Sequence, residues 1–437
     1  MTPHLPAVWR RASPLLRRPA RAAVIGALVL VLASFVWAYV EARRLESRIA
    51  SLEAAGEPLS PEEVLARRAP VPPEEDAAPF YEAAIALARR PPRSPALHRL
   101  RGTLCGPTAA LAEARDDVTT ELEANAVALE MLDRGARLPH CRFSGWPSSH
   151  LNRPRHLSVA ASSRTLSKLA GHDTTGAVES LIASFRLLRI FDTQPLLVSE
   201  AFRGALSWDF RQDVKALIEA GGPSLDTLAA LQRECAALAG RGRFAEVVRG
   251  ERAFALSESP SGSIRATAGA PTPLHSAMHY RLYVGYLDLA ADLIAASHSS
   301  VAQQRERISA VQPRGLFAES LARSFVQSYD ALTGAQAGWA SATAALAVER
   351  HRRTHGTLPE TLENVGAQPS GPLPPDPFTD APLRYRRDGE VYTVYSVGRD
   401  GRDDGGQVED ARDGPPDVGL RIEPCDPRRP TLTAGGR

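Results

Sequence analysis

The chain has 437 residues and a formal net charge of +2, so it is long enough for two or three domains. Nucleic-acid-binding domains normally carry a surplus of basic residues, so the near balance of charge argues against a nucleic-acid partner. Lys168 and Lys215 are the only lysines, and all other basic residues except the histidines are arginines. We interpret the arginine and alanine bias as the signature of a GC-rich bacterial genome rather than as phosphate-binding sites.

The first predicted element is a transmembrane helix over residues 22–40. This run contains no charged residue. At about 1.5 Å per residue it spans roughly 28 Å as a helix, close to the thickness of the hydrocarbon core of a bilayer. Trp37 and Tyr39 lie at its far end, where aromatic rings prefer the membrane interface. We therefore expect the lipid bilayer to be one partner of the chain, through residues 22–40.

Basic residues determine the predicted orientation. Residues 1–21 contain arginines and no acidic residue, whereas arginine and glutamate are mixed after Val40. The positive-inside rule then makes residues 1–21 a cytoplasmic basic tail. We expect a single-pass protein of the inner (cytoplasmic) membrane with its bulk periplasmic or extracellular.

A cleaved signal peptide is the alternative interpretation of the same run. The apolar region of a signal peptide is usually about 7–15 residues long and ends at a small-x-small cleavage site. The run here is longer and ends in bulky residues. Both interpretations send the remainder of the chain out of the cytoplasm.

Helical patterns fill most of the chain that follows. We predict a juxtamembrane helix over residues 41–58, broken by Gly56 and Pro58. Ser60 and Glu63 have the spacing of a capping box, which predicts a helix start at that point.

A helical domain is predicted over residues 59–256, because apolar residues recur there at intervals of three and four. A bundle or irregular array of antiparallel helices is the expected architecture. Residues 257–275 are rich in Ser, Pro, Gly and Ala and predict a linker or long loop. A further helical segment is expected over residues 276–343.

The pattern changes after Gly356, where closely spaced prolines exclude a continuing helix. Residues 383–386 and 391–397 contain β-forming residues, and Asp388-Gly389 between them is a hairpin turn signal. We therefore predict a mainly α protein: a transmembrane helix, a multi-helix extracytoplasmic domain and a small C-terminal α+β module with an antiparallel β-hairpin. Residues 423–437 are expected to be a flexible tail.

Three motifs in the C-terminal region carry a family resemblance. A helix ends at an H-G-x-x-P turn, a D-P-F-x-x-x-P-L-x-Y segment follows, and a Y-S-x-G-x-D-G strand and loop come next. The residues involved are His355, Gly356, Pro359, Asp376, Pro377, Phe378, Pro382, Leu383, Tyr385, Tyr395, Ser396, Gly398, Asp400 and Gly401. Residues 344–422 resemble the globular domain of the type II secretion major pseudopilins, which implies a pseudopilin-like module.

The resemblance departs from that family in two ways. No prepilin cleavage site is visible, and the membrane helix lies far upstream of the module rather than continuous with it. We therefore do not expect a processed pilus subunit. The whole layout also resembles uncharacterised membrane-anchored envelope proteins of GC-rich bacteria, from which no activity can be transferred.

The loop after Ser396 is the candidate metal site. The corresponding pseudopilin loop binds calcium, and Asp400, Asp403 and Asp404 offer the hard oxygen ligands that calcium prefers. Asp410 and Asp413 are secondary candidates. A solvated polar turn is the alternative, and we expect no other cofactor.

Four cysteines, Cys105, Cys141, Cys235 and Cys425, show no CxxC spacing. Outside the cytoplasm disulfides are permitted, and three complete pairings are open. We favour Cys105 with Cys141, because both lie in one helical region; free thiols are the alternative.

The histidines His351 and His355 share a helix face. The glutamate that marks a metalloprotease helix is replaced by Arg352, so we expect exposed histidines without metal.

The common hydrolase, phosphate-loop and dinucleotide motifs are absent from the sequence. We expect a non-enzymatic binding or scaffolding protein of the envelope, whose helical domain presents a groove or face to an envelope protein. Two alternatives are an accessory factor of a type II secretion or pilus-like system, and a hydrolase. A hydrolase would require a pocket lined by convergent polar groups.

Overall fold

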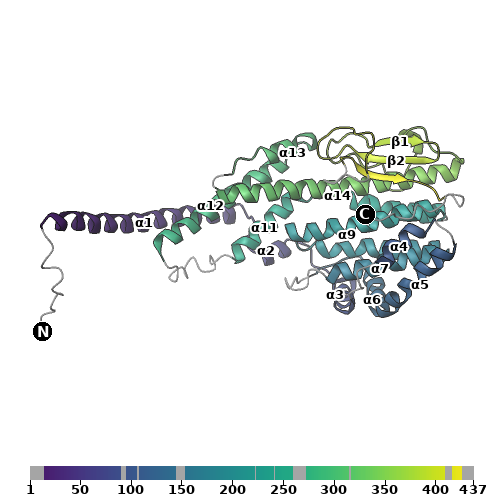
Figure 1. Ribbon diagram of the computed structural model, residues 1–437, viewed down its shortest axis with the longest axis horizontal. Helices are drawn as coiled ribbons and strands as arrows, with labels where there is room; N and C mark the ends of the chain where they lie inside the picture. The colour runs from purple at the N-terminus through teal and green to yellow at the C-terminus, as the bar shows by residue number, and fades with distance from the viewer. Residues whose placement is uncertain are drawn as a thin grey trace. The chain divides into compact units, whose positions relative to one another are not determined.

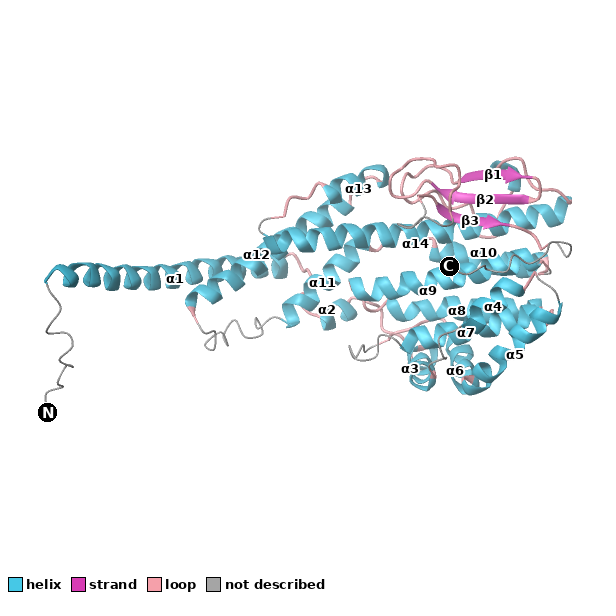
Figure 2. Cartoon of the chain, viewed as in Figure 1, coloured by secondary structure: helices cyan, strands magenta, loops and turns pink. Residues whose placement is uncertain are grey.

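A computed structural model describes residues 14–89, 95–105, 108–143, 153–221, 223–240, 242–258, 272–313, 316–408 and 416–425. These residues are mainly helical, with one three-stranded sheet near the C-terminus (Figure 2). The mainly α fold is therefore confirmed. Most of the expected linker over residues 257–275 and of the tail over residues 423–437 lies outside the described residues.

Contacts divide the chain into two compact units. The first comprises Met1–Val64, Arg252–Asp292 and Val311–Ala322, and the second comprises Leu65–Glu251, Leu293–Ala310 and Arg323–Arg437. Four helices contribute residues to both units: α2 (Pro61–Ala66), α11 (Phe244–Glu258), α12 (Pro273–Ser297) and α14 (Leu316–His355).

The first unit begins with α1 (Pro14–Ala54), which runs without a break through the predicted transmembrane and juxtamembrane helices. Within the described chain it is the one helix long and apolar enough to cross a membrane. The side chains of residues 22–33 are all exposed. Gly56, at a φ of 66°, lies just beyond its end, as expected for a residue that tolerates the left-handed conformation.

A short helix, α2, follows and extends from this unit into the second. The backbone N–H of Glu63 donates to Ser60 Oγ at 3.3 Å, so Ser60 caps the helix as predicted. The Glu63 carboxylate accepts from the N–H of Leu59 rather than of Ser60, at 2.8 Å. The Glu63 side chain therefore bonds one residue before the Ser60 N–H that a capping box predicts.

The second unit contains the remaining helices. Its α-helices, besides those shared with the first unit, are α3 (Ala78–Leu87), α4 (Pro95–Thr103), α5 (Thr108–Ala124), α6 (Ala126–Ala136), α7 (Arg153–Ala170), α8 (Thr174–Leu187), α9 (Leu197–Ala220), α10 (Leu225–Leu238) and α13 (Val301–Ser309). Short 3-10 helices are η2 (Pro73–Glu75), η4 (Leu188–Phe191) and η7 (Leu362–Val365). Asp173 and Ser224 cap α8 and α10 through their side chains.

The centre of the second unit is the middle of α14, where residues 337–349 are all buried. Alanine predominates there, so neighbouring elements can approach the helix closely. Trp339 packs edge-to-face on Phe185 of α8, with ring centroids 4.8 Å apart. The Tyr392 hydroxyl donates to the carbonyl of Ala345 at 3.2 Å. Figure 1 shows the sheet along one side of this part of α14 and α9 along another.

The sheet contains β1 (Arg384–Asp388), β2 (Val391–Ser396) and β3 (Val418–Ile422), in that order and antiparallel. Tyr385 pairs with Val394, and Tyr395 pairs with Gly419. The predicted hairpin is therefore confirmed as β1 and β2. The third strand was not predicted, because its pairing joins residues separated by a long loop.

The expected pairing of Cys105 with Cys141 is wrong. Cys105, just after α4, forms a disulfide with Cys425, just after β3, with their Cα atoms 5.0 Å apart. Cys141 and Cys235 are free thiols. Closeness in the sequence could not reveal that the C-terminal segment returns to the end of α4. The N–H of Cys425 also donates to the carbonyl of Glu219 in α9 at 3.0 Å.

A buried ion pair joins three helices near this disulfide. Arg101 of α4 donates to Asp213 of α9 at 2.6 Å, and Ser162 of α7 donates to the other carboxylate oxygen at 2.6 Å. Asp213 is completely buried, and burial raises the pKa of its carboxyl while Arg101 opposes that rise. The ionised form of the Asp213 carboxyl is therefore stabilised in the interior by Arg101 and Ser162.

We predict that Arg101→Met destabilises the protein by about 3 kcal/mol at neutral pH, because it leaves a buried charge unpaired. The loss should shrink as the pH falls, since protonation of Asp213 removes that charge. Arg99→Met is the matched control: Arg99 pairs with Asp117 at the surface of the same helix, where a pair contributes about 0–1 kcal/mol. Denaturant unfolding of the full chain in detergent measures both, and equal losses at all pH values would contradict the prediction.

Candidate functional site

A buried carboxylate, Asp376, organises the base of the loop that follows β2. Its side chain is 2% exposed. One carboxylate oxygen accepts from the N–H of Phe378 at 2.9 Å and from the Ser396 hydroxyl at 2.8 Å. The other accepts from the N–H of Val397 at 3.0 Å. Asp376 thus fixes the proline-rich segment to the end of β2, where the acidic loop begins.

Gly398 lets the two ends of this loop meet. Its φ is 69°, and a Cβ atom added there would lie 2.1 Å from the carbonyl oxygen of Pro416. Only glycine satisfies both conditions. The close approach brings the start of the loop against Pro416 and Asp417, immediately before β3.

Two of the predicted ligands, Asp400 and Asp403, are engaged by the loop itself. Asp403 Oδ1 accepts from the Tyr395 hydroxyl at 2.9 Å and from the N–H of Gly405 at 3.0 Å. The hydrogen bond from Tyr395 is the main reason that the pKa of Asp403 is lowered. Asp400 is exposed and accepts from the N–H of Arg402 at 3.1 Å, which closes a local turn.

Asp404 and Asp417 differ from these two residues. Asp404 Oδ2 and Asp417 Oδ1 are both buried and have no hydrogen-bond partner among the described residues. Asp417 is completely buried, and its other oxygen accepts from the N–H of Gly406 at 2.8 Å. Burial raises the pKa of Asp417, and the charges of Asp404 and Asp403 raise it further. Two unsatisfied carboxylate oxygens thus lie in one loop.

Asp417 was missed by the sequence reasoning. Its signal was its place between Pro415-Pro416 and the β-forming residues of β3, at the point where the acidic loop must rejoin the sheet. Asp410 and Asp413, the secondary candidates, lie outside the described residues.

The loop has features that both oppose and favour the binding of a cation. Within the described ranges no group of three or more His, Cys, Asp or Glu side chains converges as metal ligands. Arg386 donates to the carbonyl of Gly405 at 3.0 Å, and Arg384 lies 3.7 Å from Asp403, which places positive charge beside the loop. The unsatisfied oxygens of Asp404 and Asp417 nevertheless have the chemistry that a hard cation requires.

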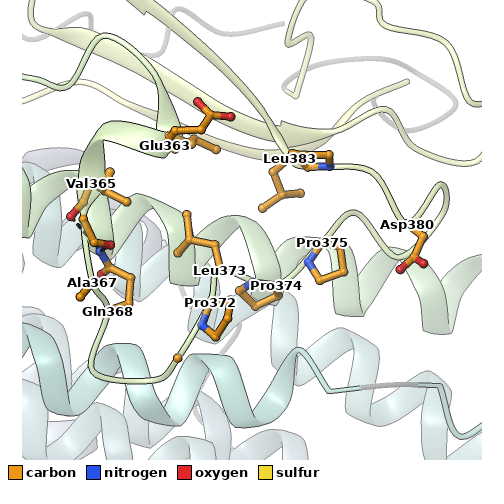
Figure 3. Close-up of a pocket in the computed structure, with 14 residues that line it drawn as sticks. Glu363, Val365, Ala367, Gln368, Pro372, Leu373, Pro374, Pro375, Asp380 and Leu383 are labelled. Atoms are coloured by element: carbon orange, nitrogen blue, oxygen red, sulfur yellow. Dashed lines mark hydrogen bonds between the residues drawn. The ribbon is translucent and has the colours of Figure 1, made fainter.

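A groove of about 610 Å³ lies in the same unit, between η7 and β1. Figure 3 shows Leu373 and Leu383 extending toward each other, with the prolines along one wall. The Gln368 amide oxygen accepts from Gln232 at 2.9 Å and from Arg350 at 3.0 Å, so this polar group is already engaged. The free surface of the groove is therefore mainly apolar.

His351 and His355 stack at 4.1 Å on α14. His355 is exposed and His351 is half-buried. No third metal-binding side chain joins them in the part of the chain that the structure describes.

We predict that Asp376→Ala destabilises the protein by about 3 kcal/mol, because three buried donors lose a charged acceptor. Glu360→Ala is the control: Glu360 is an exposed acid of the same region, for which we expect a change within about 0.5 kcal/mol. Both changes are measured by denaturant unfolding of the full chain. A loss for Asp376→Ala no larger than for the control would contradict the role of Asp376.

Comparisons with known proteins were made for the whole chain. No family model, no curated protein and no solved structure matches it.

Proposed function

We propose that α1 anchors the chain in a bacterial inner membrane, with residues 1–21 in the cytoplasm and the folded units outside it. The observation that carries this proposal is the exposed, uncharged surface of residues 22–33 on a helix long enough to cross a bilayer. Such a surface is unfavourable in water and favourable in lipid. The arginines that precede it favour this orientation.

The disulfide between Cys105 and Cys425 supports export. Disulfides persist in oxidising compartments and are rare in the bacterial cytoplasm. The pairing also links chain segments that are far apart in the sequence, so its formation requires a folded second unit.

A C-terminal alkaline phosphatase fusion tests the proposed orientation. We expect the fusion to be active in intact cells and a green fluorescent protein fusion at the same site to be dark, since each reporter folds in one compartment only. Thiol alkylation without reductant supplies a second readout: Cys141 and Cys235 should react after denaturation, and Cys105 and Cys425 should not. A mature protein that lacks α1 by mass would support the signal-peptide alternative, and an inactive phosphatase would contradict export.

We propose further that the protein acts by binding or scaffolding rather than by catalysis. The support is the groove between η7 and β1, whose lining is mainly apolar. The Gln368 amide in this groove is already hydrogen-bonded to Gln232. Such a surface suits apolar side chains of an envelope protein. A hydrolase would instead require convergent polar groups directed into the pocket.

Site-specific photocrosslinking in intact cells tests the groove. A benzoylphenylalanine in place of Leu373 should form a discrete protein adduct. The same residue in place of Glu123, an exposed position on α5, should not. Adducts at neither position, or equally at both, would contradict a binding role for the groove.

We also propose that the loop after β2 binds calcium, in keeping with the resemblance of residues 344–422 to the major pseudopilins. Asp404 and Asp417 would supply the principal carboxylates, because each holds a buried oxygen without a partner among the described residues. Asp400 and Asp403 would contribute only if their local hydrogen bonds rearranged. The resemblance also keeps an accessory role in a type II secretion or pilus-like system as a second candidate function.

Calcium titration of the full chain in detergent tests this proposal. Calcium at about 100 times its Kd should stabilise the wild type by about 2.7 kcal/mol and Asp417→Asn much less. Without calcium at neutral pH, Asp417→Asn should be the more stable protein, because a raised pKa means that the ionised carboxyl is disfavoured in the fold. That difference should disappear as the pH falls and Asp417 becomes protonated.

Asp388→Asn, at the exposed last residue of β1, is the matched control for this titration. It should respond to calcium like the wild type. Calcium that stabilises none of the three proteins would overturn the calcium site.

A further inference from the structure

Two ion pairs in the first unit align α12 with α1. Arg281 of α12 lies 3.8 Å from Glu41, and Asp288 lies 2.9 Å from Arg48. The two pairs have the same offset in residue number, so the helices run in parallel and in constant register. Figure 1 shows the start of α12 beside the C-terminal part of α1. Extrapolation of this register places Leu274 level with Ser34, and Met278 level with Ala38.

The burial of α1 agrees with this register. Side chains from residue 22 to residue 33 are all exposed, whereas Ser34, Trp37 and Ala38 are half-buried and Glu41 is buried. Packing against α1 therefore begins at Ser34, before the apolar run ends at Val40. Other parts of the unit thus reach the level of the proposed membrane span.

The face of α12 directed away from the packing carries three large apolar side chains at this level, beside the exposed His275. Ala277 and Tyr280 are buried, whereas Leu274, Met278 and Leu282 are 50%, 54% and 42% exposed. These three side chains are spaced four residues apart, so they form one stripe along the helix. A stripe of this kind on a helix is typical of insertion at a membrane interface.

Arginines mark the end of the stripe. Arg281, Arg43 and Arg44 have side chains that are 67%, 66% and 61% exposed, and they follow the apolar run by a few residues. This is the level of the lipid headgroups if residues 22–40 cross the bilayer, and guanidinium groups bind phosphate there. Exposed arginines therefore begin at a similar height on both helices.

We propose that the first turns of α12 are embedded in the outer leaflet of the bilayer beside α1, with Leu274, Met278 and Leu282 in contact with phospholipid. The proposal rests on the membrane anchoring proposed above. From the register, Leu274 lies about 9 Å and Met278 about 3 Å deeper than Val40. The protein would thus hold the membrane with a second, partly inserted helix that does not cross it.

Spin labels in the full chain, reconstituted in vesicles of phosphatidylethanolamine and phosphatidylglycerol, test this placement. A nitroxide is attached to Met278→Cys, and its collisions with oxygen and with a water-soluble nickel chelate are compared. The parent protein measures background labelling, which we expect to be small because Cys235 is buried and burial raises the pKa of Cys141 to about 12. Leu32→Cys is the lipid reference, and Ala291→Cys, exposed further along α12, is the water reference.

Met278 should resemble Leu32, with frequent oxygen collisions and few nickel collisions. A label at Met278 that matches Ala291 while Leu32 remains in lipid would overturn the embedded helix and leave the anchor intact. A label at Leu32 that is exposed to water would overturn the anchor and the inference together. Protection of Met278 from both reagents, with dipolar coupling between labels, would show that a second copy covers the stripe and would also overturn the proposal.

Discussion

Close packing around the middle of α14 is the constraint on which the second unit depends. Residues 337–349 are all buried, and their many alanines let helices and a sheet approach one helix together. Arg211 of α9 illustrates the closeness: its guanidinium is 5.9 Å from the centre of the Trp339 ring and donates to the carbonyl of Ala335 at 3.1 Å. Burial lowers the pKa of Arg211 to about 10. The buried guanidinium of Arg211 is thus held by a carbonyl oxygen and an aromatic ring.

A few specific hydrogen bonds also hold the sheet and its adjoining loop in place. It docks on α14 through Tyr392, whose hydroxyl bonds to the backbone of Ala345, and the adjacent loop is held by Asp376. The donors around Asp376 satisfy both of its oxygens, whereas Asp404 and Asp417 each retain an oxygen without a partner in the described structure. Asp376, whose two oxygens are both hydrogen-bonded, therefore has a structural role, whereas Asp404 and Asp417 are the candidate ligands.

In the first unit the main constraint is the apolar segment of α1. On α1 the boundary between exposed and packed side chains falls at Ser34, within the apolar run. Glu41 is buried at the end of that run and bonds to Trp37 Nε1 at 3.2 Å and to Arg44 at 3.0 Å. The exposed apolar segment and the packed part of the first unit therefore belong to one continuous helix.

The amino-acid sequence alone determined the features that depend on local order: the apolar helix at the N-terminus, the cap at Ser60, the helical content and the β1–β2 hairpin, whose turn lies at Gly389-Glu390, one residue beyond the predicted Asp388-Gly389. Each arises from a pattern within a few turns or strands. Tertiary structure decided the disulfide between Cys105 and Cys425, the pairing of β3, the place of Asp417 and the register of α12 on α1. These features join residues far apart in the chain, and periodicity or composition carries no information about which distant segments meet.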